Sequence, residues 1–246
     1  VFVSDSIKEI VPKYLLPLRG VIDSTDIPLN VSRSALQTDR KVRSISSFIS
    51  KKIANKLKVL LKDDPEFYSE IWDSISAFIK IGVIEDEKFA ELSQENIIFE
   101  TRLGNDKKED IDKYLEEKSL IKFNDKFYTT LFNYKERNKS FDEKKVIYCS
   151  DEISQSNALN LWISNGKEVI QADPIIDAQF LPWLESKNDN YIFQRVDSEI
   201  DEELEDQKPE IVDKDGNSNK DNLKDIISKA LNNEKVTVKV QSIKSK

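Results

Sequence analysis

Strand-like and helix-like segments alternate after residue 145, and this alternation constrains the fold more than any other feature of the sequence. Short apolar runs are typical of buried strands, and the amphipathic segments between them are typical of helices. Because a helix that joins two parallel strands follows a right-handed path, we predict a small α/β unit with a parallel or mixed sheet. The expected strands lie at residues 146–149, 168–170 and 191–193, and the expected helices at 157–165, followed by Gly166, and at 176–185.

A long amphipathic helix is predicted upstream of this unit. Apolar residues recur there at intervals of three and four positions, as one face of a helix requires. Asp63-Asp64-Pro65 ends this helix and begins a second, since proline fits the first turn of a helix. We expect Gly82 to end the second helix and residues 89–98 to form a third. The apolar positions of the first helix are Val42, Ile45, Ile49, Ile53, Leu57 and Leu60.

Other segments carry shorter patterns. Residues 8–18 favour one or two short helices with a bend, because Pro12 and Pro17 interrupt them. Residues 197–215 contain ten acidic residues against two lysines, so we expect an extended linker there. We interpret the acidic pairs of residues 201–206 as part of this linker rather than as a cation site. The remaining expectations are strands at 1–3, 127–129 and 236–240 and helices at 132–138 and 222–231.

The sequence contains no histidine and a single cysteine, Cys149, which excludes several kinds of chemistry. Zinc sites and nucleophiles paired with histidine cannot form from this chain alone. Cys149 follows an apolar run, so we interpret it as the end of a buried strand. A net charge of −8 argues against nucleic-acid binding, and no apolar stretch reaches the roughly 20 residues of a membrane span. We therefore expect a cytoplasmic protein that contacts neither nucleic acid nor membranes.

Residues 19–37 form a polar loop between two helical regions. Pro28 stiffens the loop, so Asn30, Arg33 and Gln37 are expected at defined positions. One interpretation is structural: Asn30 or Ser32 caps a helix, and Arg33 is a surface residue paired with a nearby aspartate. The other is that Arg33 binds an anion, such as a nucleotide phosphate held by another domain, because a guanidinium is always charged and donates in a planar fork.

The order of residues in this loop resembles a known family. Residues 20–24, 26–33 and 36–37, together with residues 1–3 and 11–15, closely resemble the catalytic loop region of the Hsp90 chaperones, in particular the bacterial HtpG-like branch. The resemblance continues more loosely through the rest of the chain. It implies an internal piece of such a chaperone, covering the later middle region and the start of the C-terminal region.

The resemblance also implies roles for three residues of the loop. Arg33 would reach the γ-phosphate of ATP in a separate N-terminal domain, and Asn30 and Gln37 would support the closed state. ATP and Mg would belong to the full-length protein, a homodimeric and slow ATPase that binds unfolded client proteins, and this chain alone would not turn over ATP. One departure concerns Ser34, because the family commonly has Glu directly after the arginine.

The same resemblance implies a division of the chain. In this plan the fold class is α/β, with a partial α/β/α layer, a helical connector, a second small α/β/α unit and the beginning of an α+β C-terminal domain. The segments are 1–62 with the loop and long helix, 63–100 as connector, 101–199 as small α/β unit, 200–221 as acidic linker, and 222–246 as the start of the C-terminal domain.

The large aromatic residues are candidates for contact with client proteins. Trp72 and Trp162 occupy core-like helical positions, so we expect them to be buried. Trp183 and Phe180 are the candidates for client contact, because aromatic rings dominate interface energetics. The alternative to a chaperone segment is a non-catalytic α/β module that only binds partner proteins.

Overall fold

The computed structural model describes residues 11–15, 17, 19, 40–140, 144–198, 219–231, 238 and 240. The predicted strand at 1–3 and the predicted loop at 19–37 apart from Arg19 lie outside these residues. The same is true of the acidic linker predicted at 200–221 up to residue 218, and of residues 236, 237 and 239 in the predicted strand at 236–240. The elements are η1 Lys13–Leu15, α1 Arg40–Asp63, α2 Pro65–Glu85, α3 Glu87–Ser93, η2 Gln94–Asn96, β1 Ile98–Arg102, η3 Asn105–Asp110, α4 Ile111–Glu116, β2 Ile121–Phe123, β3 Lys126–Thr130, α5 Leu131–Asn138, β4 Lys145–Cys149, α6 Ser156–Ser164, β5 Val169–Gln171, α7 Asp177–Lys187, β6 Ile192–Arg195 and α8 Asn219–Leu231.

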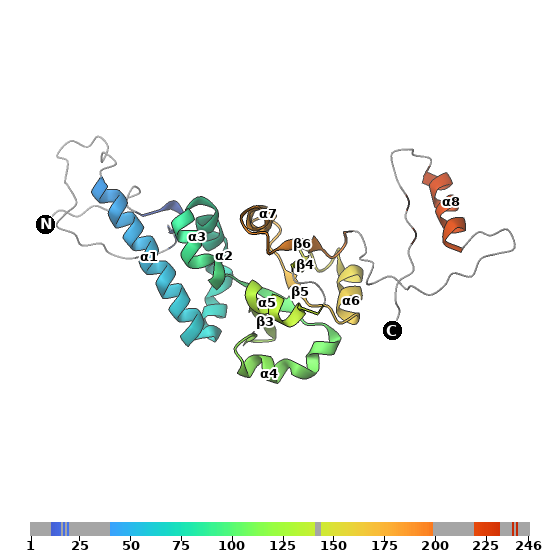
Figure 1. The fold of residues 1–246 in the computed structure, drawn as a ribbon, viewed down its shortest axis with the longest axis horizontal. Coiled ribbons are helices and arrows are strands. Elements are labelled where there is room, and N and C mark those ends of the chain that lie inside the picture. Colours follow the sequence, from blue (N-terminus) through green and yellow to red (C-terminus); the bar gives the residue numbers. More distant parts are fainter. Residues whose placement is uncertain are drawn as a thin grey trace.

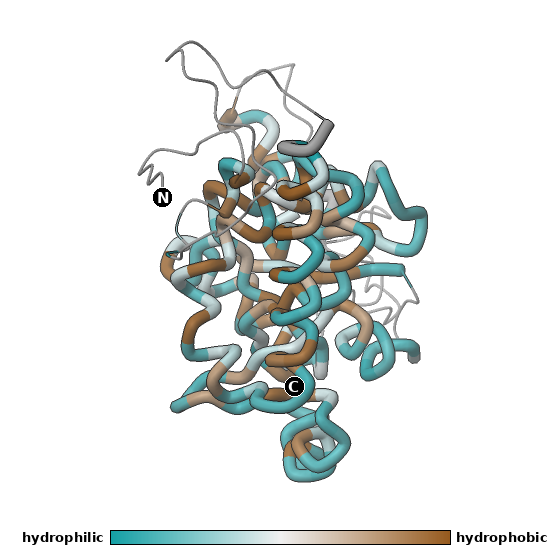
Figure 2. The backbone as a smooth tube through the Cα atoms, turned by 90° about the vertical axis from the view of Figure 1, so that its left-hand side faces the viewer, coloured by the Kyte–Doolittle hydropathy of each residue, from teal (hydrophilic) through white to brown (hydrophobic). Residues whose placement is uncertain are grey.

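Helices α1, α2 and α3 pack together beside the sheet (Figure 1). The predicted long helix is confirmed as α1, and its apolar stripe buries Ala54 and Leu57 against the other helices. Figure 2 shows hydrophobic and hydrophilic residues alternating along the helical part of the chain. The predicted boundary after α1 is also confirmed. Asp64 caps α2 by accepting a hydrogen bond of 3.1 Å from the Phe67 amide, and Pro65 takes the first position.

The prediction that Gly82 ends the second helix is wrong. Helix α2 continues to Glu85 and keeps Gly82 inside it. A Cβ atom at this position would lie 2.5 Å from Tyr14 Cδ2, so glycine is required here by close packing rather than by a helix end. The third predicted helix is shorter than expected, because residues from Ile98 onward leave the helical region and form β1.

Six strands form one mixed sheet in the order β2-β3-β1-β5-β4-β6. Strands β4, β5 and β6 run parallel, whereas β1 runs antiparallel to both β3 and β5. The strands and helices predicted between residues 146 and 193 are confirmed within one or two residues, as are β3 and α5. Strands β1 and β2 and helix α4 were not predicted. The mixed α/β fold class is therefore confirmed, while the finer layers remain a prediction.

Helices α6 and α7 cover opposite faces of the parallel strands. Val146 and Ile170 face a core that contains α7 and α2, whereas Ile147 and Val169 face a smaller core beneath α6. Trp72 and Trp162 are buried in these two cores, as predicted. Cys149 is buried at the end of β4, also as predicted.

Two buried ion pairs connect elements that are distant in sequence. Lys80 Nζ of α2 lies 2.7 Å from Asp177 Oδ1 at the start of α7, with both side chains almost fully buried. Arg137 of α5 pairs at 2.7 Å with Glu168, which also accepts hydrogen bonds from Thr101 and Asn138. Buried charges are tolerated when they are paired and hydrogen-bonded in this way. The first pair attaches the helices to the sheet unit.

The division of the chain into domains remains a prediction. Strand β1 crosses the expected boundary between residues 100 and 101, and it lies in the middle of the sheet. The predicted helix at 222–231 is confirmed as α8, which begins three residues earlier.

Candidate functional site

The described residues bracket the polar loop of the sequence. Arg33, Asn30 and Gln37 lie outside the described residues. On one side of the loop, residues 11–15 contain η1, and on the other side α1 begins at Arg40. The 3-10 helix η1 and helix α1 therefore fix the chain on the two sides of the loop.

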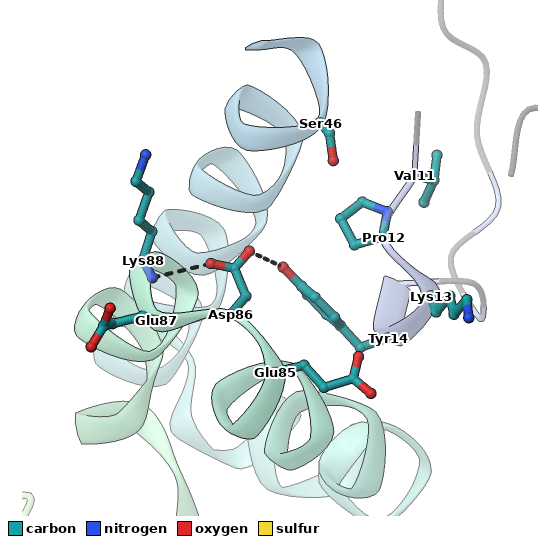
Figure 3. Close-up of a pocket in the computed structure, with 9 residues that line it drawn as sticks. All are labelled: Val11, Pro12, Lys13, Tyr14, Ser46, Glu85, Asp86, Glu87 and Lys88. Atoms are coloured by element: carbon teal, nitrogen blue, oxygen red, sulfur yellow. Dashed lines mark hydrogen bonds between the residues drawn. The ribbon is translucent and has the colours of Figure 1, made fainter. Parts of the chain in front are cut away.

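Tyr14 connects both flanks of the loop to the rest of the chain. Its hydroxyl group donates a hydrogen bond of 2.7 Å to Asp86 Oδ2 and lies 3.1 Å from Ser50 Oγ on α1. Asp86 Oδ1 accepts hydrogen bonds from the amides of Lys88 and Phe89, which caps α3. Figure 3 shows the Tyr14 hydroxyl and the Asp86 carboxylate directed toward each other. One phenol thus joins η1, α1 and the α2–α3 turn.

The Tyr14 ring is held by close packing. It lies against Gly82 on one side, and its centroid is 4.9 Å from that of Phe89. Leu15, the next residue, is also buried. Burial raises the pKa of Tyr14 above its usual value; the hydrogen bond with Ser50 opposes this shift, and Asp86 adds to it. The phenol therefore stays protonated and remains a donor at neutral pH.

A hollow of about 580 Å³ opens beside Tyr14 (Figure 3). Residues before the loop, Ser46 of α1 and the α2–α3 turn line it. Both signs of charge are present on its wall, from Lys13 and Lys88 and from three carboxylates. This mixture gives no clear preference for an anion such as a phosphate. The hollow is lined by Val11, Pro12, Lys13, Tyr14, Ser46, Glu85, Asp86, Glu87 and Lys88.

The two aromatic residues proposed for client contact differ in exposure. Phe180 is fully buried, and its ring lies 5.8 Å from Lys80 Nζ, which also lies 4.6 Å from the Phe99 ring. Trp183 stacks on Phe180 with a centroid distance of 6.1 Å and is only partly buried. Of these two residues, only Trp183 has a side chain that is partly accessible to solvent. Contact of either residue with client proteins remains a prediction.

Neither a metal cluster nor a membrane span is found in the described part of the chain. No three His, Cys, Asp or Glu side chains gather there in a way that could hold an ion. No described helix is long and apolar enough to cross a membrane.

Tyr14, Ser50 and Asp86 were not assigned a role by the sequence. Ser50 carried a recognisable signal, because it is a polar residue on the otherwise apolar, buried side of α1. Lys80 carried a similar one, since it interrupts the apolar run from Ala77 to Ile81. Neither signal names the partner, which lies 36 residues away for Ser50 and 97 for Lys80.

Comparison of the sequence with known families assigns the chain to a class of chaperones. The sequence model described as Hsp90 protein matches residues 1–245, so the chain belongs to the Hsp90 family. Curated relatives with the name Chaperone protein HtpG place it beside the bacterial members. The protein from Porphyromonas gingivalis is 35% identical over 199 residues, which cover 81% of this chain and 27% of that protein.

Two further relatives carry the same name. The HtpG of Bacteroides thetaiotaomicron is 34% identical over 216 residues, which cover 87% of this chain and 29% of that protein. The HtpG of Magnetococcus marinus is 45% identical over 86 residues, or 35% of this chain and 13% of that protein. The chain thus spans less than a third of the length of these relatives.

Proposed function

We propose that the chain is part of an ATP-dependent chaperone of the HtpG type, and that its loop presents Arg33 to the γ-phosphate of ATP held by a separate N-terminal domain. Membership of the Hsp90 family supports this proposal. The observation that carries it is the Tyr14 anchor, because it holds both flanks of the loop that contains Arg33.

The chemistry of Arg33 is electrostatic. The guanidinium neutralises charge on the terminal phosphate and donates more than one hydrogen bond to it, so docking of the two domains is favoured when ATP is present. Asn30 and Gln37 support the docked state. Magnesium and the nucleotide are held mainly by the N-terminal domain, and they supply the phosphoryl group and part of its charge compensation.

The anchor reduces the entropic cost of placing Arg33. The segment that contains Arg33 lies between Tyr14 and Ser50 in the sequence, and these two residues are connected by a hydrogen bond, so fewer arrangements compete with the docked one. In the full-length protein, a cytoplasmic homodimer, opening and closing of this arrangement acts on unfolded client proteins.

The test uses the full-length protein with Arg33→Ala and Arg33→Lys. We expect ATP turnover to fall by about tenfold or more in both variants, because lysine lacks the planar donor fork. Nucleotide binding and the thermal melt should stay unchanged. Arg19→Ala is the matched control, since Arg19 is an exposed arginine at the first position of the loop.

Unchanged turnover in Arg33→Ala would contradict the proposed role. The chain would then be better described as a non-catalytic α/β module that binds partner proteins. An equal loss in Arg19→Ala would show that the loss of turnover is not specific to Arg33.

A further inference from the structure

A second hollow lies between α5 and the turn that precedes β6. Its volume is about 290 Å³. This is close to the lower limit of roughly 300 Å³ for pockets that hold a small ligand, so the hollow has room for a single ring with a short side arm. The hollow is lined by Phe132, Lys135, Glu136, Lys139, Asn190 and Tyr191.

One face of α5 and of the residue that follows it supplies four of these side chains. Phe132, Lys135, Glu136 and Lys139 recur at helical spacing, so successive turns bring them to the same side. Phe132 is 67% exposed, the highest value for an aromatic residue in the described part of the chain. Tyr134, on the opposite side of the helix, is fully buried. Helix α5 is thus anchored to the sheet while the face with Phe132 stays open.

Tyr191 forms the other aromatic part of the wall. Its ring stacks on that of Phe193 in β6 with a centroid distance of 6.0 Å, and both residues pack against the main core. Burial, with a smaller contribution from Glu95, raises the pKa of Tyr191, so its phenol stays uncharged at neutral pH. Phe132 and Tyr191 therefore offer an uncharged aromatic surface from two separate elements.

Lys135 supplies the charge of the hollow. Its Nζ donates a hydrogen bond of 3.0 Å to the Asn190 carbonyl oxygen and lies 5.2 Å from the centroid of the Tyr191 ring. These contacts hold the ammonium group at the wall without neutralising it, and Lys135 has no ion-pair partner among the described residues. Lys139, in contrast, pairs with Glu136 at 2.6 Å, so these two charges compensate each other. One positioned positive charge is left beside two aromatic rings.

An occupant that complements this arrangement has one aromatic ring and one carboxylate. The carboxylate accepts a charge-assisted hydrogen bond from Lys135, whose ammonium group keeps two N–H groups after the bond to Asn190. The ring packs against Phe132 and against the accessible part of Tyr191, in an offset or edge-to-face contact. A cationic ligand would be repelled by the ammonium group, and an aliphatic acid would lose the contact between rings.

We propose that this hollow is a binding site for small aromatic carboxylates, in which a single ring stands two or three bonds from the acid group. The site shares no residue with the hollow beside Tyr14. A bound ligand connects α5 with the turn before β6, since Lys135 and Asn190 are 55 positions apart in the sequence. Binding should therefore also raise the melting temperature of the chain.

NMR titration of the isotope-labelled, full 246-residue chain with phenylpropionate tests the proposal. Phenylpropionamide is the comparison compound that lacks the charge, and cyclohexylpropionate is the one that lacks the aromatic ring. The variants are Phe132→Ala, Lys135→Met and Lys135→Arg. A thermal melt of each variant without ligand shows whether the fold is kept.

Helix α1 offers a matched pair of control residues. Lys52 Nζ lies 5.4 Å from the centroid of the Phe48 ring, and Phe48 is 61% exposed, but neither residue lines this hollow. Phe48→Ala and Lys52→Met therefore remove the same chemical groups at another exposed site.

We expect phenylpropionate to bind with a dissociation constant of about 0.1 to 1 mM and to shift the amide resonances of Phe132 and Tyr191. Phe132→Ala and Lys135→Met should each weaken binding by about three- to tenfold, because each loses one partly exposed contact with the ligand. Lys135→Arg keeps the charge and should retain most of the affinity. The two comparison compounds should bind at least about threefold more weakly, and the variants of Phe48 and Lys52 should bind like the parent.

Three results would overturn the proposal. The first is a parent chain that shows no saturable binding of phenylpropionate. The second is equal binding of the amide or of the cyclohexyl compound, and the third is an equal loss of affinity in Phe48→Ala or Lys52→Met. None of these measurements depends on ATP turnover, so the site and the role proposed for Arg33 stand or fall separately.

Discussion

Tyr14 places one hydroxyl group at the junction of three elements. Removal of this hydroxyl group is the sharpest test of its hydrogen bonds with Asp86 and Ser50. Tyr14→Phe leaves Asp86 Oδ2 and Ser50 without this partner in a partly buried site. We expect the free energy of unfolding to fall by about 1–3 kcal/mol. Urea denaturation measures this value. In the full-length protein the same variant should lower ATP turnover, because the flanks of the loop lose their connection.

A buried tyrosine elsewhere in the chain provides the control for this substitution. Tyr128 is 2% exposed, and its hydroxyl has no hydrogen bond within the described residues. Tyr128→Phe should therefore leave stability and turnover nearly unchanged. Equal losses in the two variants would mean that the Tyr14 hydroxyl has no special role.

Gly82 allows the Tyr14 ring to approach helix α2. In Gly82→Ala the added Cβ would lie 2.5 Å from Tyr14 Cδ2, so the ring has to move. Alanine favours a helix over glycine by about 1 kcal/mol, yet we expect a net loss of about 1–2 kcal/mol from overpacking. Urea denaturation beside Ser74→Ala, an exposed site of the same helix, separates the two effects. A stabilised Gly82→Ala protein would contradict the close packing.

At the scale of single residues, the sequence predicted which side chains are buried better than it predicted their hydrogen-bond partners. Trp72, Trp162 and Cys149 are buried as expected, because local apolar periodicity carries that information. The hydrogen bond from Tyr14 to Asp86 joins residues 72 positions apart, and no local pattern encodes it. The roles of Arg33, Asn30 and Gln37 came from a resemblance and remain predictions.

Helix α2 and helix α7 are joined by the buried Lys80–Asp177 pair. Burial lowers the pKa of Lys80 and raises that of Asp177, and each charge opposes the shift of the other. Lys80→Met leaves an unpaired buried carboxylate, so we expect a loss of about 3–5 kcal/mol in the free energy of unfolding. The double variant Lys80→Met with Asp177→Asn should recover part of this loss. The asparagine oxygen can still accept the Asp173 amide.

Urea denaturation of both single variants and the double variant gives the coupling energy of the pair. A coupling energy near zero would mean that the two helices are held together by apolar contact alone. Trp183 and Phe180 would then account for the attachment of α7 without help from the charges.

The elements differ in how readily a sequence reveals them. Helices α1 and α2 were predicted because their periodicity extends over 20 residues or more and Asp64-Pro65 marks the boundary. Strand β1 was not predicted, since Ile97 and Ile98 also fitted the apolar stripe of the preceding helix. Strand β2 has only three residues and depends on pairing with β3. Short strands are defined by their neighbours rather than by their own residues.

The stability of the whole molecule should decline in alkaline solution. Burial is the largest cause that raises the pKa of Tyr14, Tyr68 and Tyr134. Above about pH 10 the unfolded chain releases these protons while the folded chain keeps them. The free energy of unfolding then falls as pH rises, by about 1.4 kcal/mol per pH unit for each tyrosine, and it is unaffected below that range. Lys80, with a lowered pKa, acts in the opposite direction, but only below about pH 10.5, where the lysine of the unfolded chain is still protonated.

Urea denaturation between pH 8 and about pH 11 measures this dependence. Tyr68→Phe should reduce the alkaline slope by up to about 1.4 kcal/mol per pH unit, because it removes one of the retained protons. The same slope in Tyr68→Phe and in the parent would show that the Tyr68 phenol ionises within the fold.

The order of the strands has a consequence for synthesis on the ribosome. Strand β1 pairs with β3 soon after both emerge, but its other edge is covered only by β5, about 70 residues later. At about 5–20 residues per second, this edge stays open for roughly 3 to 14 s. An uncovered strand edge invites pairing with other nascent chains. Each new copy of this chaperone segment therefore passes through a stage in which it can itself aggregate.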